Sequence, residues 1–269
     1  MMMRQCLLGL FLVCFQPRSG SFISLNSRTD VVELQTAGIT ALIADTTSVA
    51  YLTGHFNPAQ HPDFVRIDRE YCSRENAFLR REAYVAFKNM VVEAKKSGIR
   101  LTILSATRNF SDQKKIWSNK WVALKQKEMK GVIRMSNIER ARYILRFSSM
   151  PGTSRHHWGT DIDLNSLKNV YFLSGEGKKV YQWLQVNATK FGFCQPYTSK
   201  ATGRTGYEEE KWHWSYRPLS DGFTLAAGNK LKDEMLKDFP GSEFASEIKM
   251  IKLYMLGISS DCLQLTENK

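Results

Sequence analysis

Apolar side chains recur at helical spacing early in the chain. Residues 74–97 carry apolar positions about one helical turn apart, and Gly98 directly after them is typical of a helix C-terminus. Residues 99–106 alternate instead and contain β-branched side chains, which predicts a strand. The hydrophobic period therefore changes from helical to extended at Gly98, as expected for a mixed fold.

Capping and turn residues mark the other elements. Ser111 is placed to cap a helix to about residue 129, and Ser136 with Glu139 forms a capping box that predicts a helix to about residue 147. Residues 22–70 are punctuated by Gly and Pro and are predicted to be irregular. The same criteria predict a strand at 159–165, a short extended segment at 170–173, a helix at 176–190 capped by Ser174 and closed by Gly192, strands at 191–194 and 212–216, and helices at 220–237 and 242–255.

Together these elements predict an α+β fold, with a small, mainly antiparallel sheet flanked by helices. The chain has 269 residues, 43% of them hydrophobic, which is enough to bury a substantial core. It contains no internal repeat and no low-complexity tract. We therefore expect one domain over residues 22–269.

The first 21 residues have the pattern of a secretory signal peptide. A short positive start is followed by an apolar run at 6–15 and by small and polar residues at 16–21. The run is too short for a comfortable membrane span, and no later segment is apolar enough to provide one. We expect an exported protein, periplasmic or extracellular, that is either free or membrane-associated.

The cysteines limit what can bind through sulfur. Outside the predicted signal peptide the chain has Cys72, Cys194 and Cys262, so at most one disulfide forms and one thiol remains. No Cys-x-x-Cys pair is present, which argues against a thiolate zinc site.

The net charge of +12 narrows the choice of partners. A basic surface suits nucleic acid, anionic lipid or an anionic polymer such as a cell wall. The sequence has no RNA-binding aromatic motif, zinc finger or basic helix, and its Lys and Arg residues are spread along the chain. We therefore expect no nucleic-acid partner.

Two separated stretches contain the side chains of a hydrolytic zinc site. Such a site uses three nitrogen or oxygen ligands and leaves one position for water, whose pKa falls to about 7 on the metal. His156 and Asp163 in one stretch and His213 in the other provide that set. Glu210, three residues before His213, is placed to act as a general base. We predict one zinc ion per chain, bound where the two stretches meet.

The same residues carry a resemblance to a known family. The pattern Ser-x-His-x-x-Gly-x-x-x-Asp at 154–163, followed by Glu-x-Trp-His at 210–213, is similar to the signature of the VanY-type D-alanyl-D-alanine carboxypeptidases. These are zinc metallopeptidases grouped with lysostaphin-type enzymes and sonic hedgehog. The resemblance, which covers about residues 79–219, implies that His156, Asp163 and His213 bind zinc and that Glu210 is the catalytic base.

Further roles follow from the same resemblance. The stretch Ser-Ala-Thr-Arg-Asn at 105–109 loosely matches a family segment that contains an arginine. The resemblance implies that Arg108 polarises the scissile carbonyl or holds the oxyanion, and an ordinary surface salt bridge is the alternative. Ser154 would line the substrate site, or be only a turn residue. His157 is interpreted as a structural histidine, which either supports a metal ligand or is simply packed.

Asp161 departs from the family pattern, which usually has alanine at this position. In a strand, Asp161 and Asp163 point to the same face. Asp161 is therefore a candidate for orienting a ligand histidine from outside the metal's own ligand set. The alternatives are that it competes as a ligand or alters specificity.

The predicted function is zinc-dependent D-alanyl-D-alanine carboxypeptidase activity, which hydrolyses the terminal D-alanine of peptidoglycan stem peptides. A peptidoglycan endopeptidase or an L,D-carboxypeptidase of the same family would use the same residues. A catalytically inactive wall-binding module is a further alternative, against which the presence of Glu210 argues. We expect a monomer whose partners are peptidoglycan stem peptides.

Overall fold

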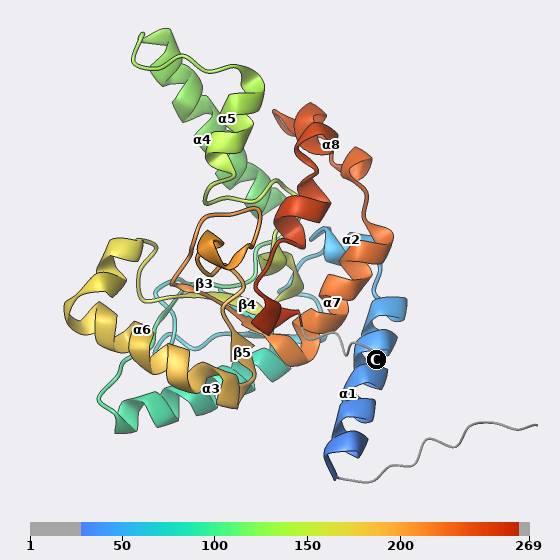
Figure 1. Cartoon of the computed structure of the whole chain (residues 1–269), viewed down its shortest axis with the longest axis vertical. Helices are drawn as coiled ribbons and strands as arrows, with labels where there is room; N and C mark the ends of the chain where they lie inside the picture. The colour runs from blue at the N-terminus through green and yellow to red at the C-terminus, as the bar shows by residue number, and fades with distance from the viewer. Residues whose placement is uncertain (1–27, 264–269) are drawn as a thin grey trace, which may run out of the picture.

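A four-stranded antiparallel sheet lies at the centre of the computed structural model, with its strands in the spatial order β3-β4-β6-β5 (Figure 1). A separate two-stranded antiparallel hairpin is formed by β1 and β2. Together with the surrounding helices, these sheets confirm the predicted α+β class. The strands are β1 (Phe64–Arg66), β2 (Phe78–Arg80), β3 (Ile103–Ser105), β4 (Asp161–Leu164), β5 (Phe193–Cys194) and β6 (His213–Tyr216).

The structure describes residues 28–263, so the predicted signal peptide lies outside the described residues. Within this range no helix is long and apolar enough to cross a membrane. The α-helices are α1 (Arg28–Thr46), α2 (Val49–Leu52), α3 (Arg81–Lys96), α4 (Phe110–Met129), α5 (Asn137–Ile144), α6 (Gly175–Asn187), α7 (Arg217–Lys230) and α8 (Ala245–Ile248).

One face of the central sheet forms the main hydrophobic core. Ile162 and Trp214, from the two middle strands, pack with Phe87 of α3 and Leu184 of α6 in one buried cluster. In Figure 1 both helices lie along this side of the sheet. The apolar stripe of α3 therefore buries itself as its helical period predicts.

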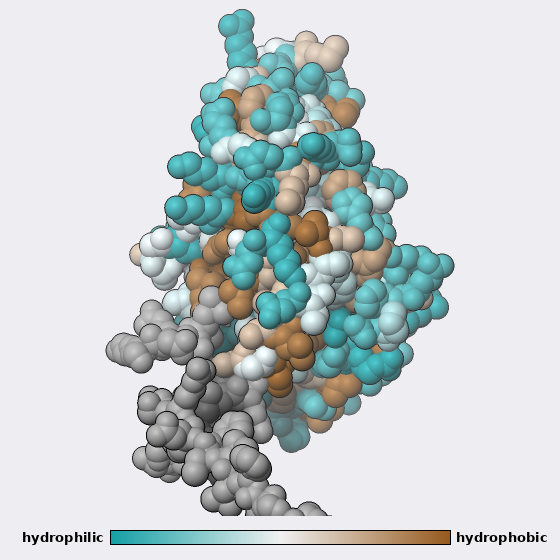
Figure 2. Space-filling model, turned by 90° about the vertical axis from the view of Figure 1, so that its right-hand side faces the viewer, coloured by the Kyte–Doolittle hydropathy of each residue, from teal (hydrophilic) through white to brown (hydrophobic). Residues whose placement is uncertain are grey.

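The opposite face of the sheet carries polar side chains and is enclosed by the other helices. Helix α7 packs along α1, where Gly222 allows close approach to Ile43. Helices α4 and α5 form a pair that projects from the body, with α8 beside them (Figure 1). Figure 2 looks at the side that carries α7 and α8, where hydrophilic residues cover the upper end and hydrophobic residues gather in the middle.

Several predicted elements agree with the structure. The capping box of Ser136 and Glu139 begins α5, and Gly192 ends the helical segment after α6 in a left-handed conformation. Helix α4 is present, but the predicted capping residue, Ser111, is wrong. The cap is Asn109, whose side chain accepts the Asp112 backbone N–H at 2.8 Å, and the Asp112 carboxylate accepts the Asn109 backbone N–H.

Predictions for three other segments are wrong. Residues 22–70 are not irregular throughout, because they contain the 19-residue helix α1, whose apolar side chains form no single stripe. Residues 78–80 form β2 instead of the start of a helix. The segment predicted as extended is the 3₁₀ helix Asn169–Leu173.

The C-terminal third also differs from its prediction. Helix α7 begins three residues earlier than expected, with Pro218 in its first turn, and ends at Lys230. The predicted helix at 242–255 is broken into short pieces: the 3₁₀ turn Ser242–Phe244, α8 and the π-helical turn Met250–Met255. Lys249, with a left-handed φ of 57°, interrupts the backbone between the last two pieces.

One disulfide connects the C-terminal segment to the sheet. Cys194 on β5 is bonded to Cys262, and Cys72 is a buried free thiol. This agrees with the prediction of one bridge and one leftover cysteine. The bridge closes a loop over a sequence separation of 68 residues.

Candidate metal centre

The register of the two middle strands sets the geometry of the site. Asp163 lies opposite His213 across the β4–β6 ladder, and Asp161 lies opposite Ser215. Because side chains alternate along a strand, both pairs project from the polar face of the sheet, while Ile162 points into the core. Directly opposed side chains on neighbouring antiparallel strands lie close together, so the register alone pairs the aspartate with the histidine.

His156 reaches the same place from the 3₁₀ helix Arg155–Trp158, which runs into β4. The turn between them needs Gly159, whose φ is +73° and where an added Cβ would lie 2.3 Å from the Phe64 ring. The rings of His156 and His213 have centroids 4.7 Å apart. The two stretches therefore meet although they are distant in sequence.

The three predicted ligands form a compact cluster of buried polar atoms. Asp163 Oδ1 lies 3.4 Å from His156 Nε2 and 3.3 Å from His213 Nδ1. One ligand atom from each of these residues lies within 4.8 Å of the others. His156 Nε2 and Asp163 Oδ1 are buried without a hydrogen-bond partner among the described residues. Such unsatisfied atoms are costly, and a metal ion between them satisfies both.

Each ligand histidine has a second ring nitrogen that is bonded within the protein. His156 Nδ1 lies 2.8 Å from the Ala106 carbonyl oxygen, and His213 Nε2 lies 2.7 Å from Asp161 Oδ2. Because a carbonyl and a carboxylate only accept, each of these nitrogens donates, so that the neutral rings carry their lone pairs on His156 Nε2 and His213 Nδ1. Two imidazoles and one carboxylate presented in this way fit a zinc ion.

Glu210 lies beside this cluster. Its Oε2 is 3.3 Å from His213 Nδ1, and the side chain is almost fully buried. Burial raises the pKa of Glu210 above that of an ordinary glutamate, although His213 acts in the opposite direction. A carboxylate with a raised pKa is suited to accept a proton and to release it again.

Arg108 and Ser154 line the same pocket, which has a volume of about 310 Å³. Arg108 follows β3, its backbone N–H donates to the His156 carbonyl, and its Nη1 donates to Ser105 Oγ at 3.3 Å. Burial lowers the pKa of Arg108. Ser154 Oγ is buried and has no hydrogen-bond partner among the described residues. Arg108 makes no salt bridge within residues 28–263, so the surface-salt-bridge alternative finds no partner there.

His157 points away from the cluster and is packed, as interpreted from the sequence. Its Nδ1 lies 2.6 Å from the Arg108 carbonyl, and its Nε2 accepts the Gly152 N–H at 3.1 Å. Burial lowers the pKa of His157 to about 3, so the ring is neutral. Gly54 lies against this ring, where a Cβ would come within 2.4 Å of Nδ1.

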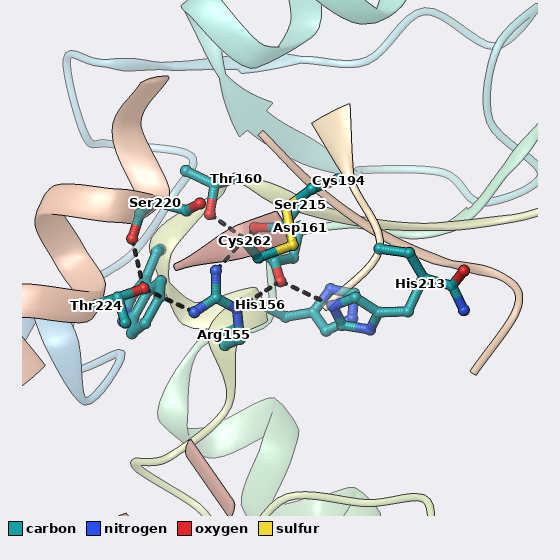
Figure 3. A network of polar contacts seen from close by, with 12 residues as sticks. Arg155, His156, Thr160, Asp161, Cys194, His213, Ser215, Ser220, Thr224 and Cys262 are labelled. Atoms are coloured by element: carbon teal, nitrogen blue, oxygen red, sulfur yellow. Dashed lines mark hydrogen bonds and ion pairs between the residues drawn. A yellow bond between two sulfur atoms is a disulfide. The ribbon is translucent and has the colours of Figure 1, made fainter. Parts of the chain in front are cut away.

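Asp161 lies behind His213, where its two oxygens are occupied by hydrogen-bond donors (Figure 3). The sequence reasoning missed one of these donors, Arg155, although it stands inside the motif. It also missed Tyr197, whose ring centroid lies 4.7 Å from that of His213. An arginine directly before a predicted ligand was the available signal for the first, and Tyr197 gave none.

Part of this chain is similar in sequence to known proteins. Residues 76–219 match the family model described as VanY, D-alanyl-D-alanine carboxypeptidase. The chain is 31% identical over 175 residues to the Bacillus subtilis protein named "Putative carboxypeptidase YodJ", which covers 61% of this chain and 56% of that protein. It is 37% identical over 68 residues to a D-alanyl-D-alanine carboxypeptidase of Enterococcus faecalis, which covers 25% of this chain and 24% of that one.

The chain thus spans about half the length, or less, of these curated relatives. A solved structure of VanYB in complex with D-alanine-D-alanine aligns at 22% identity with a TM-score of 0.48, covering 66% of this chain and 91% of that chain. The family model itself matches more than half of the present sequence. The protein therefore belongs to the VanY family of D-alanyl-D-alanine carboxypeptidases.

Proposed function

We propose that this protein is an exported zinc peptidase that removes the terminal D-alanine from peptidoglycan stem peptides. The observation that carries the proposal is the convergence of His156, Asp163 and His213 beside Glu210 at one pocket, where His156 Nε2 and Asp163 Oδ1 have no hydrogen-bond partner among the described residues. Family membership supports the proposed substrate class.

His156, Asp163 and His213 would hold one zinc ion. When bound, zinc supplies Lewis-acid activation of water and of the scissile carbonyl. Glu210 takes the proton that water loses as its oxygen bonds to the carbonyl carbon. Glu210 then gives this proton to the nitrogen of the leaving D-alanine as the C–N bond breaks. The raised pKa of Glu210 favours this exchange.

Arg108 and Ser154 would act on the substrate. A fixed cation close to the reacting carbonyl stabilises negative charge that develops on its oxygen. Arg108 lines the pocket, and within residues 28–263 its guanidinium makes only one side-chain hydrogen bond, to Ser105, which supports this role. The unpartnered hydroxyl of Ser154 is available to bind a polar group of the peptide.

Export agrees with two features of the chain. The first 21 residues have a signal-peptide pattern, and Cys194 is bonded to Cys262. Disulfides persist in oxidising compartments outside the cytosol. The basic composition would favour an anionic wall polymer.

Mass spectrometry of the products tests the function. The purified protein is incubated with a pentapeptide precursor, a tetrapeptide precursor and a crosslinked dimer. Release of one D-alanine from the pentapeptide alone supports the proposal. Preferred trimming of the tetrapeptide would instead show an L,D-carboxypeptidase, and cleavage of the dimer an endopeptidase. No cleavage by the zinc-loaded protein would indicate a binding module.

A further inference from the structure

Asp161 is buried and its carboxylate is surrounded by donors. Oδ1 accepts the hydroxyls of Thr160 and Ser215, each at 2.7 Å. Oδ2 accepts Arg155 Nε at 3.1 Å and His213 Nε2 at 2.7 Å. Four donors leave this carboxylate no free position toward the pocket, so Asp161 is not available as a fourth metal ligand. Its position instead allows it to fix the ring of a ligand.

Arg155 holds the carboxylate from behind. The side chains of Arg155 and Asp161 both have a relative accessibility of 0%. Arg155 Nη1 donates to Thr224 Oγ1 at 2.8 Å, and Nη2 donates to Ser215 Oγ at 2.9 Å. Its guanidinium also stacks over the Trp158 ring, 4.6 Å from the centroid. A planar arginine held at three nitrogens has one orientation, and so has the carboxylate bonded to it.

We infer that Asp161 and Arg155 are positioning residues that hold His213 with its Nδ1 lone pair toward the metal. The bond from His213 Nε2 to Asp161 fixes both the tautomer and the rotation of the ring (Figure 3). Outer carboxylates of this kind raise the affinity of a metal site. This inference rests on the proposed zinc peptidase, because it assigns these residues to the same metal.

The network also reaches beyond the part of the chain that matches the family. That match ends at residue 219, whereas Thr224 lies in the next turn of α7. The Thr224 hydroxyl donates a hydrogen bond to the Ser220 carbonyl oxygen at 2.6 Å. Helix α7 is thus connected through Arg155 and Asp161 to a predicted metal ligand. Asp161, which departs from the family pattern, therefore forms one supporting cluster with Arg155, Ser215 and Thr224, the last of which lies in the part of α7 beyond the family match.

The inference is tested by measuring the zinc affinity of the full chain in competition with a chromophoric chelator. Asp161→Ala should weaken zinc binding about 10- to 100-fold, and Asp161→Asn, which keeps an acceptor for His213, should weaken it less. Because Asp161→Ala leaves a buried arginine unpaired and can unfold the protein, the double variant Arg155→Met/Asp161→Ala removes both charges. Circular dichroism should show that this double variant is folded. Its zinc affinity should nevertheless be about 10- to 100-fold lower than that of the native protein.

The visible spectrum of the cobalt-substituted protein gives a second readout. The double variant should show a changed d–d absorption, because the His213 ring is no longer fixed, whereas a merely structural pair would leave the spectrum unaltered. Asp233→Asn is the matched control: it removes a half-buried carboxylate that accepts the Ile251 N–H, and its zinc affinity should equal that of the native protein. Native zinc affinity and spectrum in the folded double variant would overturn the inference alone. A native protein that binds no zinc would overturn the proposed function together with it.

Discussion

Two clusters of buried polar side chains are in contact on the polar side of the sheet. They differ in whether their polar atoms have hydrogen-bond partners. In the ligand cluster of His156, Asp163 and His213, the atoms His156 Nε2 and Asp163 Oδ1 have no hydrogen-bond partner among the described residues. In the supporting cluster of Asp161, Arg155, Ser215 and Thr224, the polar atoms bond to one another. His213 belongs to the first and is bonded to the second.

The difference separates what the fold stabilises from what it prepares for binding. A satisfied buried network contributes to a unique structure, whereas unsatisfied buried atoms lower stability until something binds them. Asp161 and Asp163 lie in the same strand with one residue, Ile162, between them. Residue type and burial therefore do not distinguish a ligand from its support, but the partners of each oxygen do.

The strongest test of the comparison is removal of a ligand without loss of volume. Asp163→Asn should weaken zinc binding by more than about 100-fold, since loss of even an outer partner costs 10- to 100-fold. Its effect on the stability of the zinc-free protein should be smaller than its effect on zinc binding, because Asp163 Oδ1 has no hydrogen-bond partner among the described residues and only ion-pair contacts to His156 and His213. Isothermal titration with zinc and urea unfolding of the apo protein measure both. A large loss of apo stability with unchanged affinity would reverse the assignment.

Glu210→Gln separates proton transfer from metal binding. We expect kcat to fall by about 10²- to 10⁴-fold, because a general base is lost. Zinc content should stay that of the native protein, as Glu210 is not one of the three ligands. Steady-state kinetics and elemental analysis of the same preparation check this. Full hydrolysis by the variant would show that another group accepts the proton.

Arg108→Met tests the cation of the pocket. We expect kcat/KM to fall by about 10²-fold, which is the usual cost of one group that stabilises developing negative charge. Arg108→Lys keeps the charge with different geometry and should recover part of the loss. Zinc affinity should change little in both. Native kinetics of Arg108→Met would assign Arg108 to structure alone.

Thr224→Val perturbs only the supporting cluster and should have the smallest effect. It leaves Arg155 Nη1 without its acceptor, so the free energy of unfolding should fall by about 1–3 kcal/mol. Zinc affinity should fall by less than tenfold, because Asp161 keeps its other donors. Thr224→Ser, which retains the hydroxyl, is the control in chemical denaturation. Equal stability of both variants would show that the Arg155–Thr224 bond contributes nothing.

The sequence supports prediction of the ligand cluster better than prediction of its support. His156, Asp163 and His213 stand in a spaced motif, and the strand period alone places Asp161 and Asp163 on one face. Arg155 stands directly before a predicted ligand, but its role could not be derived from the sequence, because its partners Ser215 and Thr224 come from elements distant in sequence. A spaced motif records the residues of a site, but not the fold that determines their neighbours.

The same limit applies to the fold. Helix α3 was predictable because its apolar residues form a stripe, and the capping box at Ser136 marks the start of α5. Helix α1 has no such stripe, and it gains its stability by packing on α7. The broken segment after Gly241 follows a helical pattern in sequence, but Lys249 adopts a left-handed conformation that interrupts it, which the pattern does not reveal.

X-ray diffraction from crystals of the native protein, collected on both sides of the zinc absorption edge, measures the central claim most directly. We predict one anomalous peak per chain, about 2.0–2.2 Å from His156 Nε2, His213 Nδ1 and a carboxylate oxygen of Asp163. Asp161 should remain bonded to His213 and outside the coordination sphere. An anomalous peak elsewhere, or one coordinated by Asp161 in place of Asp163, would contradict the account.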